Sequence, residues 1–285
     1  MDYSTLIRDL QALHLNLYDL ALYTPKGIQT YRFQPGSNCS NSYSVAKVFI
    51  VTALGILWDE GRWHPNDPIC RYLDLPADAE PRWKDVTIEH AITHRIGFDE
   101  GFLDIDSDDT TLYPTQDYLS MVFSHPLVHA PGTHEQYSDA AYYLLSRLIT
   151  SICGERTDTF LHHRILQPLG FHEAAWSRCP QDYPIGATGL YISSEDMVKL
   201  GALYLQSGVW QGQRLLSREW TNMVLGCGYE LTPLSPDVPG CTLIGKWGMY
   251  GQLLALSPER QLAIAIHAHM RRSDSNRLGE YLSRL

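Results

Sequence analysis

Apolar and polar residues change their spacing several times along the 285-residue chain, and each spacing predicts a type of element. Apolar residues at helical spacing predict a short amphipathic helix over residues 3–13. Residues 15–24 and 28–33 alternate between apolar and polar around a Pro-Lys-Gly turn, which predicts a β-hairpin. Residues 44–58 are apolar on most faces, which predicts a buried helix.

The middle of the chain, from residue 61 to about residue 184, has a different pattern. Strand signals fade, and helical patterns recur between clusters of Pro, Gly and Asp, near residues 87–93, 115–124, 138–153 and 157–166. The strand signal returns from about residue 186. The last hundred residues predict helices over 195–206, 217–224 and 275–284, and strands over 252–256 and 261–268.

This order predicts an α+β fold in which strands from both ends of the chain share one antiparallel sheet. We expect residues 1–60 and 185–285 to form an α/β lobe, and residues 61–184 to form an inserted helical lobe. Hydrophobic residues make up 44% of the chain and charged residues 19%, which excludes a disordered or fibrous protein.

Charge and cysteine content narrow the classes of partner. The net charge of −10 argues against binding nucleic acid or an anionic membrane, because phosphates repel a negative surface. We expect no membrane span, since no run of about 18 apolar residues exists, and no secretory signal at the N-terminus. Six scattered cysteines without a Cys-x-x-Cys pair argue against a thiolate zinc site and predict reduced thiols in a cytoplasmic protein.

A Ser-x-x-Lys element, Ser44-Val45-Ala46-Lys47, begins the predicted buried helix. A spacing of three residues places both side chains on one helix face, within hydrogen-bond reach. A serine hydroxyl is a weak nucleophile that needs a base, and a lysine amine serves as one where burial lowers its pKa from about 10.4 towards roughly 7–8. The helix start also offers backbone N–H groups, among them that of Ser44, to an oxyanion.

Two interpretations of this element stay open on local sequence alone. Among the five lysines of the chain, only Lys47 follows a serine by three residues, which favours a catalytic pair. In the alternative, Ser44 lies near a helix N-cap and the Lys47 side chain extends to solvent.

Later segments, in the same order along the chain, extend the pattern. They are residues 91–97 (AITHRIG), 131–139 (PGTHEQYSD), 167–171 (QPLGF), 189–197 (GLYISSEDM) and 217–220 (SREW). Together with Ser44–Lys47 they resemble the serine β-lactamase and penicillin-binding-protein family, in particular its class C β-lactamase-like hydrolases, which include esterases and D-amino-acid peptidases. The resemblance runs from about residue 44 to residue 266, most of the chain.

The resemblance implies a β-lactamase/transpeptidase-like fold, with an antiparallel sheet flanked by helices, an all-α lobe, and the active site in the cleft between the two lobes. It also implies that Tyr137 is the family's Tyr-x-Asn tyrosine, which moves protons beside the serine and lysine; without the resemblance, a buried aromatic residue is the favoured interpretation of Tyr137. Asp139 stands where the family has Asn. A carboxylate can accept a hydrogen bond from Lys47 but cannot donate one to a substrate carbonyl, which argues against strong β-lactam or peptide recognition. It would also hold Lys47 charged and leave Tyr137 as the working base.

The family's third element is Lys-Thr-Gly or His-x-Gly on a strand at the edge of the cleft, and the candidate here is Lys246-Trp247-Gly248. Lys246 would add positive charge, and the N–H of Met249 would be the second oxyanion donor. Trp247 replaces the threonine and has no hydroxyl to hold a substrate carboxylate. In an alternative register only Trp247-Gly248 and Gly251-Gln252 match the "G-x-GGQ" segment of related hydrolases, and Lys246 faces away.

Other candidates are weaker. His90 and His94 share a helix face but form no His-Glu-x-x-His arrangement, so core or loop histidines are favoured over a zinc site. No glycine-rich nucleotide loop exists. The acidic residues from Asp99 to Asp109 predict a solvated loop; a sharper hypothesis places this loop at the rim of the cleft, where it would favour cationic substrates.

The sequence therefore predicts a cytoplasmic serine hydrolase that cleaves a small ester or amide, with weak turnover of β-lactams, through an acyl-enzyme. Ser44, Lys47 and Tyr137 would be catalytic, and no metal or organic cofactor is expected. One alternative is a non-catalytic member of the fold that binds a peptide or forms assemblies, motivated by Asp139 and Trp247. Another is a histidine-ligated metal hydrolase. The sequence does not indicate the oligomeric state.

Overall fold

The computed structural model describes residues 3–235, 238 and 241–284, and the chain folds into two compact units. The first unit consists of Met1–Val48, Ile165–Ala175 and Leu190–Leu285. The second consists of Phe49–Arg164 and Trp176–Gly189.

The borders of the units differ from those expected at residues 60 and 185. Helix α2 (Ala46–Asp59) begins in the first unit and continues into the second, so most of it is counted with the helical unit. The segment 165–175 belongs to the first unit because helix α7 (Ser194–Leu205) holds it. There Lys199 Nζ donates to the Gly170 carbonyl at 2.6 Å.

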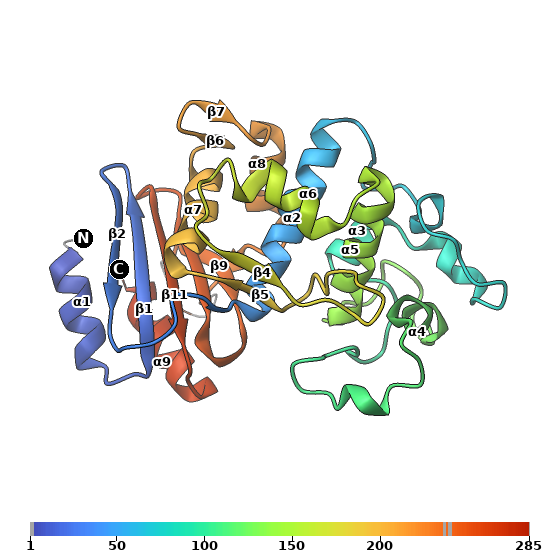
Figure 1. Ribbon diagram of the computed structural model, residues 1–285, viewed down its shortest axis with the longest axis horizontal. Helices are drawn as coiled ribbons and strands as arrows, with labels where there is room; N and C mark the ends of the chain where they lie inside the picture. The colour runs from blue at the N-terminus through green and yellow to red at the C-terminus, as the bar shows by residue number, and fades with distance from the viewer. Residues whose placement is uncertain (1–2, 236–237, 239–240, 285) are drawn as a thin grey trace. The chain divides into compact units, whose positions relative to one another are not determined.

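The first unit is built on a six-stranded antiparallel sheet with the order β2-β1-β11-β10-β9-β8 (Figure 1). Its strands are β1 (Leu17–Thr24), β2 (Gly27–Arg32), β8 (Thr232–Pro233), β9 (Ile244–Trp247), β10 (Leu253–Ser257) and β11 (Leu262–Ala268). Strands β1 and β11 come from opposite ends of the chain and pair in register from Leu20↔Ile266 to Tyr23↔Ala263. The sheet therefore joins the beginning of the chain to its end.

Helices cover both faces of this sheet, because successive side chains of its strands point to opposite faces and are apolar on both. Helices α1 (Tyr3–Ala12) and α9 (Arg272–Ser283) share one hydrophobic core with Leu253 and Ile264. Helix α7 packs on β1, β10 and β11 from the other face. A β-carbon at Gly201 of α7 would lie 3.0 Å from that of Ala263, so glycine allows the close approach.

Two small sheets complete this part of the chain. Strands β3 (Ser40–Asn41), β5 (Leu190–Ile192) and β4 (Ala174–Trp176) form one sheet in the order β3-β5-β4. Strands β6 (Val209–Trp210) and β7 (Gln213–Arg214) form a hairpin before helix α8 (Arg218–Cys227). The N–H of Ser42 donates to the Leu190 carbonyl at 2.8 Å, which anchors the chain just before Ser44.

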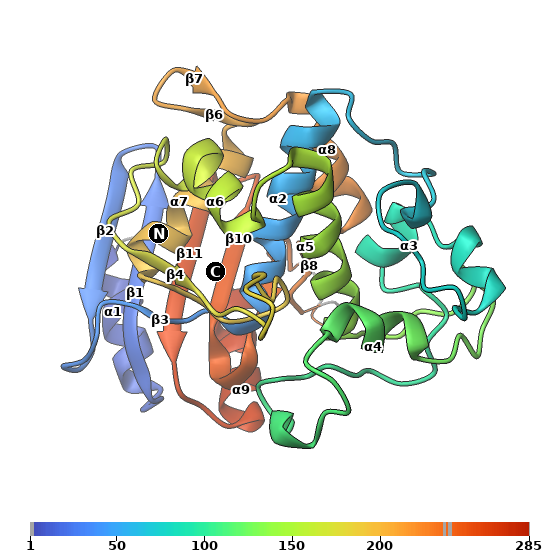
Figure 2. The same ribbon diagram turned by 45° about the vertical axis from the view of Figure 1, so that its right-hand side comes forward.

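The second unit is helical and centres on α5 (Asp139–Cys153), most of whose residues are buried. Around α5 lie α3 (Ile88–Ile92), α4 (Tyr118–Ser124) and α6 (Thr157–Leu161), and α3 runs beside α5 (Figure 2). The hydroxyl of Tyr142 donates to the Ile92 carbonyl at 3.1 Å and ties α5 to α3. Buried polar groups of this kind need a partner, because an unmade hydrogen bond costs about 1–3 kcal/mol.

All six cysteines lie in the described part of the chain and are free thiols. Within the described residues, none of the helices combines the length and apolar character needed to cross a bilayer.

Candidate active site

Ser44 and Lys47 form a hydrogen-bonded pair in the first unit. Ser44 lies in the 3₁₀ turn η1 (Tyr43–Val45), and Lys47 lies in the first turn of α2. Lys47 Nζ donates to Ser44 Oγ at 3.0 Å, and the Lys47 side chain is fully buried. The interpretation in which this side chain extends to solvent is therefore wrong. A buried amine needs such an acceptor, because burying it without one is costly.

The backbone just before the nucleophile candidate is unusual. Tyr43 has φ of 47°, the left-handed region that residues with a β-carbon seldom adopt. Such strain persists only where the surroundings hold it, and it is common at functional sites. Here the N–H of Tyr43 donates to Asn41 Oδ1 at 2.9 Å, and the rings of Tyr43 and Tyr250 meet edge to face at 5.5 Å.

The end of β9 packs directly against this turn. A β-carbon at Gly248 would lie 2.5 Å from the Ser42 carbonyl oxygen and 3.2 Å from Tyr43 Cβ, so only glycine fits there. The structure therefore brings the predicted third element, Gly248 and the adjoining Met249, next to the turn that carries Ser44.

Lys246 and Trp247 lie on opposite faces of β9. The ammonium of Lys246 forms an ion pair with Glu230, whose side chain is buried. The ring of Trp247 packs on the core that contains α1 and α9, and it lies 3.5 Å from where a β-carbon of Gly279 would be. Sequence reasoning did not identify Glu230, because it precedes Lys246 by sixteen residues and meets it only through folding.

Tyr137 belongs to the second unit, directly before α5, and is 45% exposed. Its ring packs against the imidazole of His94, with centroids 4.5 Å apart. His94 Nδ1 also accepts from the N–H of Ser138 at 3.3 Å. His94 thus holds the segment that carries Tyr137. The sequence carries a signal for this role, since His94 lies in the AITHRIG segment, but the pattern around His94 predicts only a core or loop histidine.

Asp139 is nearly buried at the start of α5, also in the second unit. Its carboxylate lies with those of Asp104 and Asp106, each with an oxygen within 4.8 Å of the others. This group of carboxylates was not predicted, although Asp104 and Asp106 belong to the acidic stretch noted in the sequence. That Asp139 and Tyr137 meet Ser44 and Lys47 stays a prediction of the resemblance.

The remaining candidates have local partners. The His90 side chain takes part in a capping box with Thr87 at the start of α3. Burial lowers the pKa of His90, which keeps its ring neutral. Within the acidic stretch, Asp99 contacts His129 at 2.9 Å and Asp109 caps a 3₁₀ turn. These contacts give the two side chains structural roles.

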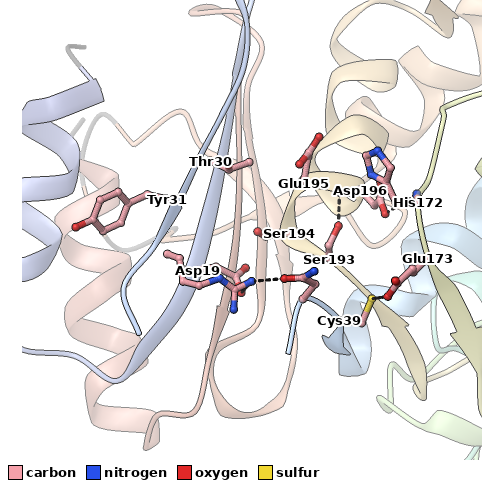
Figure 3. A pocket seen from close by; sticks show the side chains of 12 residues that line it. Asp19, Thr30, Tyr31, Cys39, His172, Glu173, Ser193, Ser194, Glu195 and Asp196 are labelled. Atoms are coloured by element: carbon pink, nitrogen blue, oxygen red, sulfur yellow. Dashed lines mark hydrogen bonds and ion pairs between the residues drawn. The ribbon is translucent and has the colours of Figure 1, made fainter. Parts of the chain in front are cut away.

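A polar pocket of about 330 Å³ lies elsewhere on the first unit, between β1, β2 and the start of α7 (Figure 3). Its lining includes Asp19, Cys39, Glu173 and Glu195. The Cys39 thiol donates to Glu173 at 3.4 Å. None of the residues predicted for the active site lines this pocket.

Comparison with known proteins identifies the family of the chain. The Beta-lactamase family model matches residues 39–284, most of the chain. The chain belongs to the beta-lactamase family. One curated relative, from Escherichia coli (strain K12), is named "Putative D-alanyl-D-alanine carboxypeptidase" and is 30% identical over 125 residues. A relative of the same name from Salmonella typhimurium is 28% identical over 163 residues.

Both matches are partial. They cover 41% and 51% of this chain, and 29% and 36% of the respective relatives. The chain of this beta-lactamase family member thus spans about a third of the length of the curated relatives that it matches.

Solved structures share the fold over nearly the whole chain. A penicillin-binding protein homologue from Caulobacter crescentus superposes with a TM-score of 0.80 at 15% identity, covering 99% of this chain and 98% of that one. A β-lactamase/D-alanine carboxypeptidase from Pseudomonas syringae gives 0.71 at 16% identity, covering 99% and 96%. These likenesses establish the β-lactamase/transpeptidase fold.

Proposed function

We propose that this protein is a serine hydrolase that cleaves a small ester or amide through an acyl-enzyme on Ser44. The observation that carries the proposal is the 3.0 Å contact between Lys47 Nζ and Ser44 Oγ, with the amine fully buried. A serine becomes a nucleophile when a base is held within hydrogen-bond reach, and this pair has that geometry. Membership of a family of hydrolases supports the same conclusion.

In the first step, Ser44 Oγ attacks the substrate carbonyl carbon and forms a C–O bond. The hydroxyl proton passes to Lys47 in its neutral form, or to the phenolate form of Tyr137 where Lys47 stays charged. The N–H groups of Ser44 and Met249 would hold the oxyanion, and such donors are worth roughly 10²–10³ in rate.

In the second step, the tetrahedral intermediate collapses and its bond to the leaving oxygen or nitrogen breaks. The leaving group takes up the proton through Tyr137, and water then attacks the acyl-enzyme. That attack releases the acid and returns the proton to Ser44. Each step uses side chains and backbone groups of this chain, and a water molecule from solvent.

Asp139 bears on the choice of substrate. Its carboxylate lies among those of Asp104 and Asp106, and a carboxylate cannot donate to the carbonyl of a β-lactam or peptide. We therefore favour small esters and simple amides, with weak turnover of β-lactams. The names of the curated relatives support an amide as the second substrate class.

Steady-state hydrolysis of 4-nitrophenyl acetate, a small anilide and a chromogenic cephalosporin tests this proposal. We expect kcat/KM for the ester to exceed that for the cephalosporin, and Ser44→Ala to abolish both. Tyr137→Phe and Lys47→Ala should each lower kcat about 10²- to 10⁴-fold, the usual contribution of a positioned acid or base. Ser124→Ala, at an exposed serine of α4, is the matched control and should retain full activity.

The alternative is a binding or assembly module with the same fold. It predicts that wild-type protein, Ser44→Ala and Ser124→Ala are equally inactive on all three compounds. Retained activity in Ser44→Ala that is lost on treatment with a chelator would instead indicate a metal hydrolase.

A further inference from the structure

A cavity of about 960 Å³ lies beside the turn that holds the proposed oxyanion donor. The end of β9 and the turn η6 (Met249–Gly251) form one wall, and the start of α9 forms another. Its lining is apolar on the side of the strand and turn, with Leu234, Trp247, Met249, Tyr250 and Met270, and polar on the side of α9, with Arg271, Arg272, Ser275, Asn276 and Glu280. Cavities of this size and character bind groups as large as a drug molecule.

The cavity adjoins the turn of the candidate nucleophile within the same unit. Tyr43, which directly precedes Ser44, packs its ring against the cavity residue Tyr250 at 5.5 Å. Gly248, another lining residue, fits against the Ser42 carbonyl with no room for a β-carbon. A substrate carbonyl held by Ser44 and Met249 would therefore have an apolar cavity directly beside it.

The walls of the cavity are firmly held. The N–H of Met270 donates to the Tyr250 carbonyl at 2.8 Å, which ties the segment just before α9 to the turn η6. The Tyr250 ring stacks on His269 with centroids 4.5 Å apart. These contacts join the walls of the cavity to one another, so the fold itself holds the cavity in shape, and a preformed site lowers the ordering cost of binding.

We propose that this cavity binds a bulky apolar substituent of the substrate and sets the specificity of the enzyme. This inference rests on the proposed function. The substituent is an alkyl or aryl group attached next to the scissile carbonyl, on either the acyl side or the leaving-group side. Burying apolar surface against Trp247 and Met270 supplies the binding free energy, at roughly 25 cal/mol per Å².

Gly279 is the specificity-determining residue in this account. It is buried on α9 and lines the cavity between Trp247 and Ser235. A β-carbon there would meet the Trp247 ring at 3.5 Å and Ser235 Oγ at 3.6 Å, both ordinary contacts. A single methyl group is therefore tolerated, whereas a leucine side chain would occupy space that the substrate needs.

Two series of esters test the inference and separate the two sides of the substrate. The first compares 4-nitrophenyl acetate, butyrate and octanoate. The second compares methyl acetate with octyl acetate, followed by acid release in a pH-stat. We expect kcat/KM to rise at least tenfold along one series. In Gly279→Leu the ratio of kcat/KM for the long-chain ester to kcat/KM for the acetate should fall towards one.

Gly226→Leu is the matched control, because Gly226 of α8 is exposed, lies outside the cavity and has open space at its β-carbon position. If Gly279→Leu does not fold, Asn276→Trp narrows the cavity from the exposed side of α9, with Asn222→Trp of α8 as its control. Circular dichroism establishes folding in each case.

Two results would overturn the inference. The first is an equal kcat/KM along both series, and the second is an equal loss on acetate and long-chain esters in Gly279→Leu. Either would show that the cavity does not set specificity, and would leave the proposed function intact. No turnover of any ester by the wild-type protein refutes the proposed function, and this inference with it.

Discussion

Cys39 has an environment that suppresses its reactivity. Burial, the hydrogen bond to Glu173 and the charge of that carboxylate raise the pKa of the thiol to about 11. The reactive form of a cysteine is the thiolate, which is scarce at pH 8 when the pKa is this high.

We therefore expect iodoacetamide at pH 8 to modify Cys39 at least tenfold more slowly than the exposed Cys227. Glu173→Gln removes the negative charge, so it should lower the Cys39 pKa and speed the reaction several-fold. Peptide mapping by mass spectrometry gives both rates, and Glu259→Gln, an exposed site elsewhere in the unit, is the control. Equal rates at Cys39 and Cys227 would contradict this account.

Among the contacts of the candidate site residues, the local one could be predicted and the long-range ones could not. The Ser44–Lys47 contact follows from helical spacing, which is why it could be predicted. The contact of Lys246 with Glu230 and that of Tyr137 with His94 join residues far apart in the chain. Such contacts depend on how elements pack, and no spacing rule reports them.

At the scale of elements, the meeting of β9 with the turn η1 depends on the absence of a side chain at Gly248. A β-carbon there would force the Ser42 carbonyl, 2.5 Å away, to move, and that shift would displace Ser44. We expect Gly248→Ala to lower stability by about 1–3 kcal/mol, the usual cost of overpacking. It should lower ester hydrolysis more than tenfold.

Gly226→Ala in α8 provides the comparison, because its β-carbon position is open and its backbone is helical. It should leave the rate of ester hydrolysis unchanged. It should raise the free energy of unfolding by no more than about 1 kcal/mol, because alanine is the better helix former. Urea unfolding and ester hydrolysis measure both effects. A fully active Gly248→Ala would show that this packing does not position Ser44.

The loop between α2 and α3 depends on Asp67. Burial alone would raise the pKa of this carboxyl, but hydrogen bonds from the Tyr72 hydroxyl at 2.6 Å and the His64 N–H at 2.8 Å, together with Arg71, lower it overall. A lowered folded-state pKa contributes stability above the unfolded value of about 3.9, and that contribution is lost as the pH falls through the folded-state pKa.

Asp67→Asn should therefore lower stability by about 1–2 kcal/mol at pH 7, and the difference from wild type should shrink as the pH falls below about 4. Denaturant unfolding at pH 7, 5 and 3 measures this, with Asp78→Asn at an exposed position as the control. A difference that stays constant from pH 7 to pH 3 would exclude an ionised Asp67 as its source.

Long periodic segments were predicted well and short ones were not. The helix over 3–13, the hairpin and the strand over 261–268 are confirmed as α1, β1–β2 and β11. The predicted helix over 157–166 is wrong in its second half, where Leu161 is followed by a π-helix, His162–Leu166. Strands β4, β6, β7 and β8 contain two or three residues, too few to show an alternation.

At the scale of the whole molecule, the antiparallel sheet that joins both ends of the chain could be predicted, because the longest alternating apolar segments lie near the two ends. The borders of the two units could not, since α2 runs from one into the other and α7 binds the segment 165–175 through side-chain and backbone contacts. The proposed catalytic residues come from both units, with Ser44 and Lys47 in the first and Tyr137 in the second.

The most direct test of the central claim is intact-mass analysis after incubation with a fluorophosphonate and, separately, with a penicillin. The account predicts one fluorophosphonate adduct on the wild-type protein and on Ser124→Ala, none on Ser44→Ala, and slow or incomplete labelling by penicillin. Digestion should place the adduct on Ser44. Folded wild-type protein that gains no mass with either reagent, or that is labelled equally in Ser44→Ala, would contradict the acyl-enzyme mechanism.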